Sequence, residues 1–120
     1  MLAYEMIKMK NWVVIGSVNN EQKYACRILN KFKSHGYNVA GVNPKGENGV
    51  YKHLKDVPYK IDAIDLCINS TLGIEYMKEA RELGIKYVLI QPGAESREIG
   101  MYCKEHGIVA VKGCALIELG

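Results

Sequence analysis

The segment Trp12-Val-Val-Ile-Gly16 decides how the rest of the chain is interpreted. It is a short, almost wholly apolar run that ends in glycine, which is typical of a strand covered on both faces of a parallel sheet. From Glu21 to Lys33, apolar residues recur at steps of three and four positions, which predicts an amphipathic helix that ends near Gly36. We therefore expect a central buried strand followed directly by a helix.

The same alternation continues through the rest of the sequence. The pattern predicts further strands and helices, namely strands over Asn38–Val42, Ala63–Ile68, Tyr87–Ile90 and Ile108–Val111, a weak short helix over Lys52–Asp56, a helix capped by Ser70 or Thr71 that ends at Gly84, and a helix over Glu95–His106. Strands that alternate with helices predict a parallel sheet with right-handed crossovers and helices on both faces. The expected fold class is α/β, a Rossmann-like three-layer sandwich with a parallel five-stranded sheet, formed as a single domain over residues 1–120.

The composition is that of a globular domain. Hydrophobic residues make up 48% of the 120 residues and charged residues 24%, which is unlike the composition of a disordered chain. The formal net charge of +3 is too small to indicate a nucleic-acid groove or an anionic membrane surface. A small polyanionic ligand would still suit this basic excess.

No apolar run approaches the roughly 20 residues that cross a bilayer, and the first residues lack the apolar region of a signal peptide. We therefore expect a cytoplasmic protein with no membrane partner. The four cysteines have no zinc-ligand spacing, so neither a metal site nor a disulfide framework is expected.

Polar or glycine-bearing segments follow every predicted strand. Ligands of open parallel sheets bind beyond the carboxyl ends of the strands, so these segments are the candidate site. They are Gly16-Ser17-Val18, Asn43-Pro44-Lys45, Asn69-Ser70-Thr71, Gln91-Pro92-Gly93-Ala94 and Lys112-Gly113-Cys114. The first could hold a phosphate on free backbone N–H groups at a helix start, or could be a plain tight turn.

The segment after the second strand is more discriminating. NAD-binding folds usually end this strand in Asp or Glu, which accepts hydrogen bonds from the ribose hydroxyls. This chain instead has Asn43, Pro44 and Lys45. A lysine there favours a nucleotide that carries an additional phosphate on its ribose.

Together these motifs resemble the small stand-alone CoA-binding proteins, which are related to the nucleotide-binding domain of the succinyl-CoA synthetase α subunit. The resemblance runs from Trp12 to Glu118 and depends on the order and spacing of several short motifs. They are Val-Ile-Gly16 with Lys23, Gly36-Tyr37, Val42-Asn43-Pro44-Lys45, Asp56-Val57-Pro58 before Ile61-Asp62-Ala63-Ile64-Asp65, Asn69-Ser70, Gln91-Pro92-Gly93-Ala94, and Cys114 with Ile117-Glu118.

The resemblance implies a bound coenzyme A or acyl-CoA in an extended groove. Its diphosphate would lie at Gly16, Ser17 and Val18 with Lys23 as a further contact, its phosphorylated ribose near Asn43, Pro44 and Lys45, and its pantetheine arm past Asn69, Ser70, Gln91 and Gly93 towards Cys114. Two positions depart from the family pattern. The first loop has its hydroxyl at Ser17, one position earlier than in relatives, and Ala115 stands where a proline often follows the late cysteine.

The remaining polar residues suggest no catalytic set. The histidines are not spaced to pair with a nucleophile and a carboxylate, and we expect them to be solvated. Asp62 and Asp65 are expected to be solvated at the start of a strand. Cys26, Cys67 and Cys103 are expected to be buried as small apolar residues. Cys114 instead follows a strand at the ligand end of the sheet, where it would either exchange with the thiol of the ligand or only line the groove.

The sequence thus predicts a module that binds CoA or acyl-CoA without complete catalytic machinery. Two alternatives stay open: an NAD(P)-binding redox protein, and the CoA-binding subunit of a split acyl-CoA synthetase whose partner is an ATP-grasp protein. A homo-oligomer also stays open, and no nucleic-acid partner is expected.

Overall fold

The computed structural model describes residues 1–120 and contains one parallel five-stranded sheet with the strand order β2-β1-β3-β4-β5. Every neighbouring pair is parallel. The strands are β1 (Asn11–Gly16), β2 (Asn38–Val42), β3 (Ala63–Cys67), β4 (Tyr87–Ile90) and β5 (Val109–Lys112). The predicted α/β Rossmann-like fold class is confirmed.

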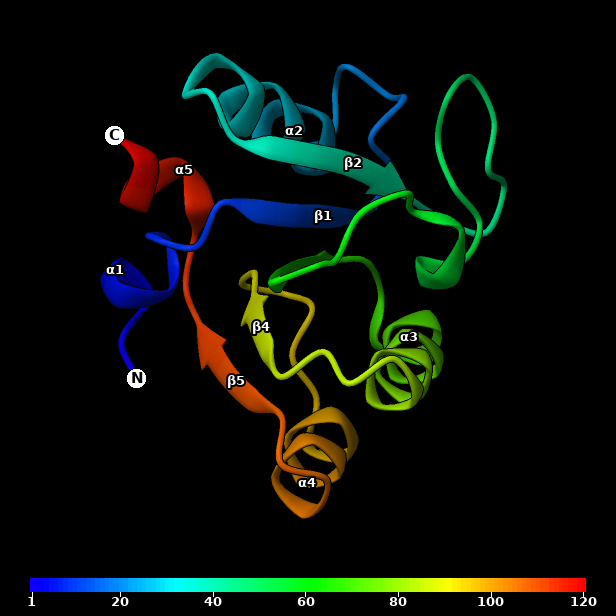
Figure 1. The fold of residues 1–120 in the computed structure, drawn as a ribbon, viewed down its shortest axis with the longest axis vertical. Coiled ribbons are helices and arrows are strands. Elements are labelled where there is room, and N and C mark those ends of the chain that lie inside the picture. The colour runs from blue at the N-terminus through cyan, green and yellow to red at the C-terminus, as the bar shows by residue number, and fades with distance from the viewer.

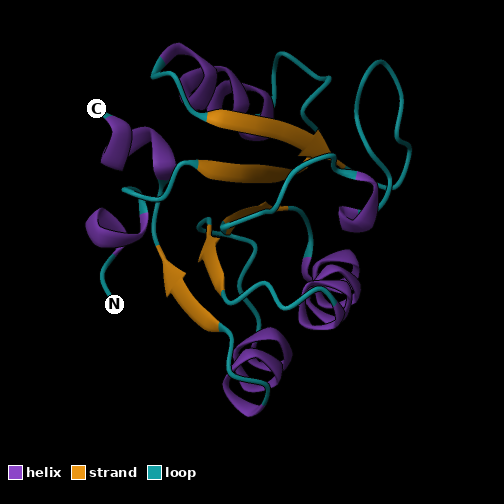
Figure 2. Ribbon diagram, viewed as in Figure 1, coloured by secondary structure: helices purple, strands orange, loops and turns teal.

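Helices cover both faces of the sheet (Figures 1 and 2). One face carries α2 (Tyr24–Ser34) with the short helices α1 (Ala3–Met6) and α5 (Ala115–Leu119). The other face carries α3 (Ser70–Glu82) and α4 (Arg97–Glu105), together with the single 3-10 turn η1 (Leu54–Asp56). None of these helices has the length and apolarity that would let it cross a bilayer.

The strand β1 is the buried centre that its sequence predicts. Val13 and Ile15 belong to the core beneath α3 and α4, whereas Trp12 and Val14 belong to the core beneath α2. The Trp12 ring packs against Phe32 of α2, with 4.9 Å between the ring centroids. Alternate residues of one strand therefore anchor helices on opposite faces.

The strand order places a reversal at β1. From β1 the chain first moves outward to β2 and then crosses to β3 on the other side, after which each new strand adds at the same edge. Crevices form outside the carboxyl ends of strands at such a reversal, because the loops after the two neighbouring strands diverge to opposite faces. The topology therefore predicts a ligand-binding crevice between the loops that follow β1 and β3.

Several element ends differ from those predicted. Helix α2 begins at Tyr24 and not at Glu21, because residues 17–23 form consecutive hydrogen-bonded turns. Asn69, and not Ser70 or Thr71, caps α3: its Oδ1 accepts a hydrogen bond of 3.0 Å from the Leu72 N–H.

Other differences lie in the second half and at the chain ends. Helix α4 begins at Arg97, where Ser96 caps it, and β5 lies one residue later than predicted. The short helix expected over Lys52–Asp56 is limited to η1. The helices α1 and α5 were not predicted, because four or five residues are too few to show a helical period.

Candidate functional site

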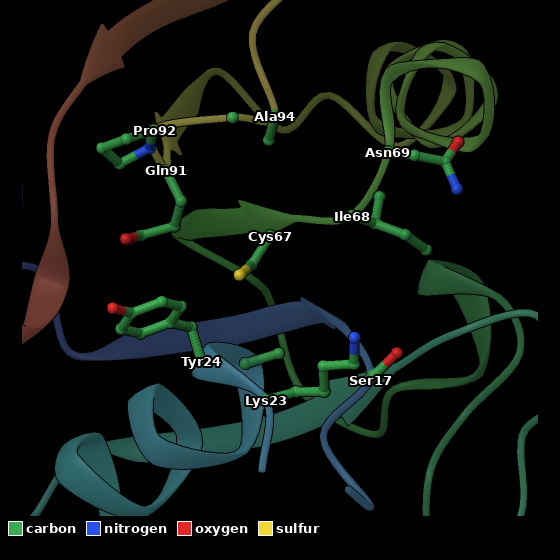
Figure 3. A pocket seen from close by; sticks show the side chains of 11 residues that line it. Ser17, Lys23, Tyr24, Cys67, Ile68, Asn69, Gln91, Pro92 and Ala94 are labelled. Carbon is green, nitrogen blue, oxygen red and sulfur yellow. The ribbon is translucent and has the colours of Figure 1, made fainter.

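A cavity of about 340 Å³ opens at the carboxyl ends of β1, β3 and β4, at the reversal of strand order. Figure 3 shows that its walls come from three loops and from the first turn of α2. We call it the central pocket. Its lining residues are Ser17, Lys23, Tyr24, Ala25, Cys67, Ile68, Asn69, Gln91, Pro92, Gly93 and Ala94.

The N-terminus of α2 is the most polar wall of this pocket. The N–H groups of Tyr24, Ala25 and Cys26 donate no hydrogen bond within the protein, and no side chain caps the helix. By contrast, the side chain of Asn69 caps α3 and that of Ser96 caps α4. Free N–H groups and the positive end of the helix dipole together favour an anion at this position.

Gly16 allows the three elements around the pocket to approach one another. A Cβ atom at Gly16 would overlap the carbonyl oxygen of Cys67 on β3 and would lie 2.8 Å from the Cβ of Ala25 on α2. Only glycine fits where β1, β3 and α2 meet. Gly16 therefore has a packing role, and the diphosphate contact that the resemblance implies for it stays a prediction.

Asn43 holds the loop after β2 beside the loop after β1. Its side chain is buried, and its Nδ2 donates to the Gly16 carbonyl at 3.1 Å. Its Oδ1 accepts from the N–H groups of Lys45 and Gly46, both at 3.0 Å. Since these bonds use both ends of the amide, Asn43 positions the exposed Lys45 rather than presenting free polar atoms.

A second groove, of about 600 Å³, lies between the segment after β2 and α3. The start of α3 separates the two cavities: Asn69 lines the central pocket, and Leu72 lines this groove. Its lining residues are Pro44, Lys52, His53, Lys55, Leu72, Glu75, Tyr76, Lys78, Glu79 and Glu82. Sequence reasoning did not single out Lys52 and Lys55, although their spacing after Lys45 could have indicated a basic loop.

The structure brings part of the predicted set together. Five predicted residues line the central pocket and one lines the second groove, while the others lie beneath or beside them. The five in the central pocket are Ser17, Lys23, Asn69, Gln91 and Gly93, and the one in the second groove is Pro44. Three of the others are buried beneath the cavities, namely Gly16, Val18 and Asn43. The last three line neither cavity: Lys45, Ser70 and Cys114.

Asp65 corrects a prediction. It is fully buried, not solvated, because β3 lies between β1 and β4 with helices on both faces. Its Oδ2 accepts a hydrogen bond of 2.7 Å from the Nε2 of Gln91, while its Oδ1 has no partner. Burial raises the pKa of Asp65 to about 8, against the opposing effect of the Gln91 bond. Asp62, in contrast, is half-buried at the strand start and accepts from the Asn11 N–H.

Cys67 is the cysteine that reaches the pocket, and this also differs from expectation. It ends β3, is only half-buried, and its sulfur points into the central pocket (Figure 3). The pKa of the Cys67 thiol is raised to about 11, mainly by burial and further by the negative charges of Asp65 and Cys114. Cys114 is the residue before α5; it is half-buried and does not line the pocket. Cys26 and Cys103 are buried, as predicted.

No group of three or more His, Cys, Asp or Glu side chains is arranged to hold a metal ion. The polar groups that line the central pocket are the Lys23 ammonium, the hydroxyls of Ser17 and Tyr24, the amides of Asn69 and Gln91, and the Cys67 thiol.

Comparison with known protein families identifies this arrangement. A family model described as CoA binding domain matches residues 10–120, nearly the whole chain. The chain belongs to this CoA-binding domain family. The predicted resemblance is thus confirmed.

Solved structures of the same size share the fold. A hypothetical protein from Pyrococcus horikoshii OT3 is 29% identical, with a TM-score of 0.87 over 98% of this chain and 89% of its own. A conserved hypothetical protein from Pyrococcus furiosus is 31% identical, with a TM-score of 0.84 over 92% of this chain and 99% of its own. An NAD binding oxidoreductase from Klebsiella pneumoniae, 13% identical with a TM-score of 0.52 over 87% of this chain and 34% of its own, shares the fold alone.

Proposed function

We propose that this member of the CoA-binding domain family binds coenzyme A or an acyl-CoA as a stand-alone module. The observation that carries the proposal is the uncapped N-terminus of α2, which faces the central pocket with three free N–H groups. A diphosphate at this position would accept those hydrogen bonds, and the ammonium group of Lys23 would add a charged contact.

The two cavities suggest how an extended ligand would lie. The diphosphate would occupy the loop Gly16-Ser17-Val18 and the α2 terminus. The ribose 3′-phosphate would lie near Lys45, with Lys52 and Lys55 at the adjacent second groove. The pantetheine arm would then run past Asn69, Ser70, Gln91 and Gly93 in the direction of β4 and β5.

The distribution of charge supports the same orientation. Residues 1–60 carry ten of the 16 Lys and Arg residues and only four of the 13 acidic residues. This half of the chain supplies β1, β2 and α2, where the phosphates are proposed to bind. This excess of positive charge would attract the polyanionic end of the ligand, while its neutral arm would extend towards β4.

Calorimetric titration of the pure protein tests the proposal. We expect CoA to bind with a dissociation constant in the micromolar range and NAD to bind more weakly. NAD lacks the 3′-phosphate, and β2 is followed by Asn43, Pro44 and Lys45 instead of the Asp or Glu that would accept its ribose hydroxyls. Binding of NAD without binding of CoA would contradict the proposal.

A substitution at Lys45 tests the phosphate contact. Lys45→Ala is expected to weaken CoA by about 1 to 3 kcal/mol, the range of a charge-assisted hydrogen bond, and to leave dephospho-CoA nearly unchanged. Lys86→Ala is the matched control, because Lys86 is also an exposed lysine but directly precedes β4, at the amino ends of the strands and so at the opposite end of the sheet from the pocket. Equal losses for both ligands would show that Lys45 does not contact the 3′-phosphate.

The chain itself offers no nucleophile, base and orienting group together, so we propose a carrier, sensor or subunit role rather than an independent synthetase. An ATP-grasp partner, a homo-oligomer and a cytoplasmic location stay predictions. ATP-dependent thioester formation by the isolated chain would contradict the binding-module proposal.

A further inference from the structure

Cys67 gives the central pocket a thiol that binding alone does not use. It is the last residue of β3, and its neighbour across the sheet is Gly16 of β1. Its sulfur is directed into the pocket between Tyr24 and Gln91 (Figure 3). A ligand seated in this pocket would therefore meet a thiol.

Cys114 lies on the same face and at the same end of the sheet. The ends of β3, β4 and β5 are level, since the Gln91 N–H donates to the Leu66 carbonyl and the Gly113 N–H to the Ile90 carbonyl. After Gly113 the chain turns over the α2 face, where Ala115 is fully buried in the core cluster that Cys67 packs against.

The pKa of Cys67 agrees with this placement of Cys114. Negative charge on Cys114 is one of the causes that raise the pKa of Cys67. Both thiols are free in this structure. A second thiol thus lies on the same face and at the same end of the sheet as the one that faces the pocket.

We propose that Cys67 and Cys114 form a dithiol that reduces a disulfide of the pocket's ligand by thiol–disulfide exchange. The proposed substrate is a disulfide that contains CoA, formed either between two CoA molecules or between CoA and another small thiol. The identity of this substrate rests on the proposed function. The dithiol itself rests only on the placement of the two cysteines.

The exchange has two steps. The Cys67 thiolate attacks one sulfur of the ligand disulfide, forming a bond between Cys67 and that sulfur and expelling the other half as a thiolate, which takes up a proton. The Cys114 thiolate then attacks the Cys67 sulfur, forming the Cys67–Cys114 disulfide and releasing the second half as a thiol. Two protein thiols are oxidised and one ligand disulfide is reduced to two thiols.

The environment of Cys67 sets the rate and the product. Because its pKa is raised to about 11, only a small fraction of Cys67 is thiolate at neutral pH, so the first step is expected to accelerate about tenfold per pH unit between pH 7 and 9. A thiol of high pKa is also a poor leaving group. The internal disulfide, once formed, is therefore expected to persist.

Mass spectrometry of the folded protein after exposure to CoA disulfide tests the proposal. Each cysteine lies in its own tryptic peptide, so the products can be assigned. The wild type is expected to lose two hydrogens, to show a cross-link between the peptides of Cys67 and Cys114, and to release free CoA. Cys114→Ser should instead retain one CoA on Cys67, because the resolving thiol is missing. Cys67→Ser should react at least tenfold more slowly.

Two controls separate this proposal from the binding proposal. Hydroxyethyl disulfide carries no nucleotide, and CoA binding is measured independently by calorimetry. If CoA does not bind but hydroxyethyl disulfide still cross-links Cys67 to Cys114, the binding proposal fails and the dithiol stands. If CoA binds and neither disulfide produces the cross-link in the wild type, the dithiol is overturned. A cross-link through Cys26 or Cys103, or equal rates for the wild type and Cys67→Ser, would also overturn it.

Discussion

Gly16→Ala is expected to lower the free energy of unfolding by about 2 to 3 kcal/mol, the upper part of the range for overpacked sites, and to remove ligand binding. The added methyl group would overlap the Cys67 carbonyl and crowd the Cβ of Ala25 at 2.8 Å. Neither neighbour can rotate away, because one is backbone of the central sheet and the other lies in the first turn of α2. Relief requires that α2 or β3 move, and both form walls of the central pocket.

Urea denaturation and calorimetric titration with CoA measure the two effects. Gly100→Ala is the matched control, because Gly100 lies inside α4 with no atom within 4 Å of the added methyl position. There the same substitution is expected to stabilise the protein by about 0.5 to 1 kcal/mol through helix propensity. A Gly16→Ala protein as stable as Gly100→Ala would show that β1, β3 and α2 do not meet as described.

The sheet could be predicted from the sequence because its strands are short apolar runs with glycine or proline nearby. The run that ends at Gly16 and the run from Tyr87 to Ile90 are both buried strands in the structure. The start of α2 could not be placed as well, since the turns of residues 17–23 depend on contacts with other loops. One such contact is the hydrogen bond from Asn19 Nδ2 to the Glu47 carbonyl.

The place of the site could be predicted from topology, whereas its chemistry could be predicted only in part. Loops after parallel strands share one edge, which is why residues as distant in sequence as Ser17, Asn69 and Gln91 line one pocket. Which strand-end side chains face that pocket depends on strand register and on the helix above. For this reason the sequence predicts that Cys67 is buried and only packs in the core, whereas in the structure it lines the pocket.

Asp65→Asn is expected to make the protein more stable at pH 8 than the wild type, and the gain should be several kcal/mol larger than at pH 4. Asparagine keeps an acceptor for the Gln91 Nε2 bond but carries no ionisable proton. In the folded wild type the pKa of Asp65 is about 8, whereas in the unfolded chain it lies near the usual value of 3.8. Each unit of such a difference corresponds to about 1.4 kcal/mol.

The sign of the effect follows from proton binding. Between about pH 4 and pH 8 the unfolded chain has lost the Asp65 proton while the folded protein retains it, so the wild type loses stability as pH rises through this window. The variant lacks this loss. Urea denaturation of both proteins across the window measures the difference, with Asp62→Asn as the control, because Asp62 lies half-buried at the strand start.

If the difference in stability between Asp65→Asn and wild type does not grow with pH, Asp65 is ionised in the folded protein. Its unpartnered Oδ1 would then need a compensating partner that the packing around β3 does not provide.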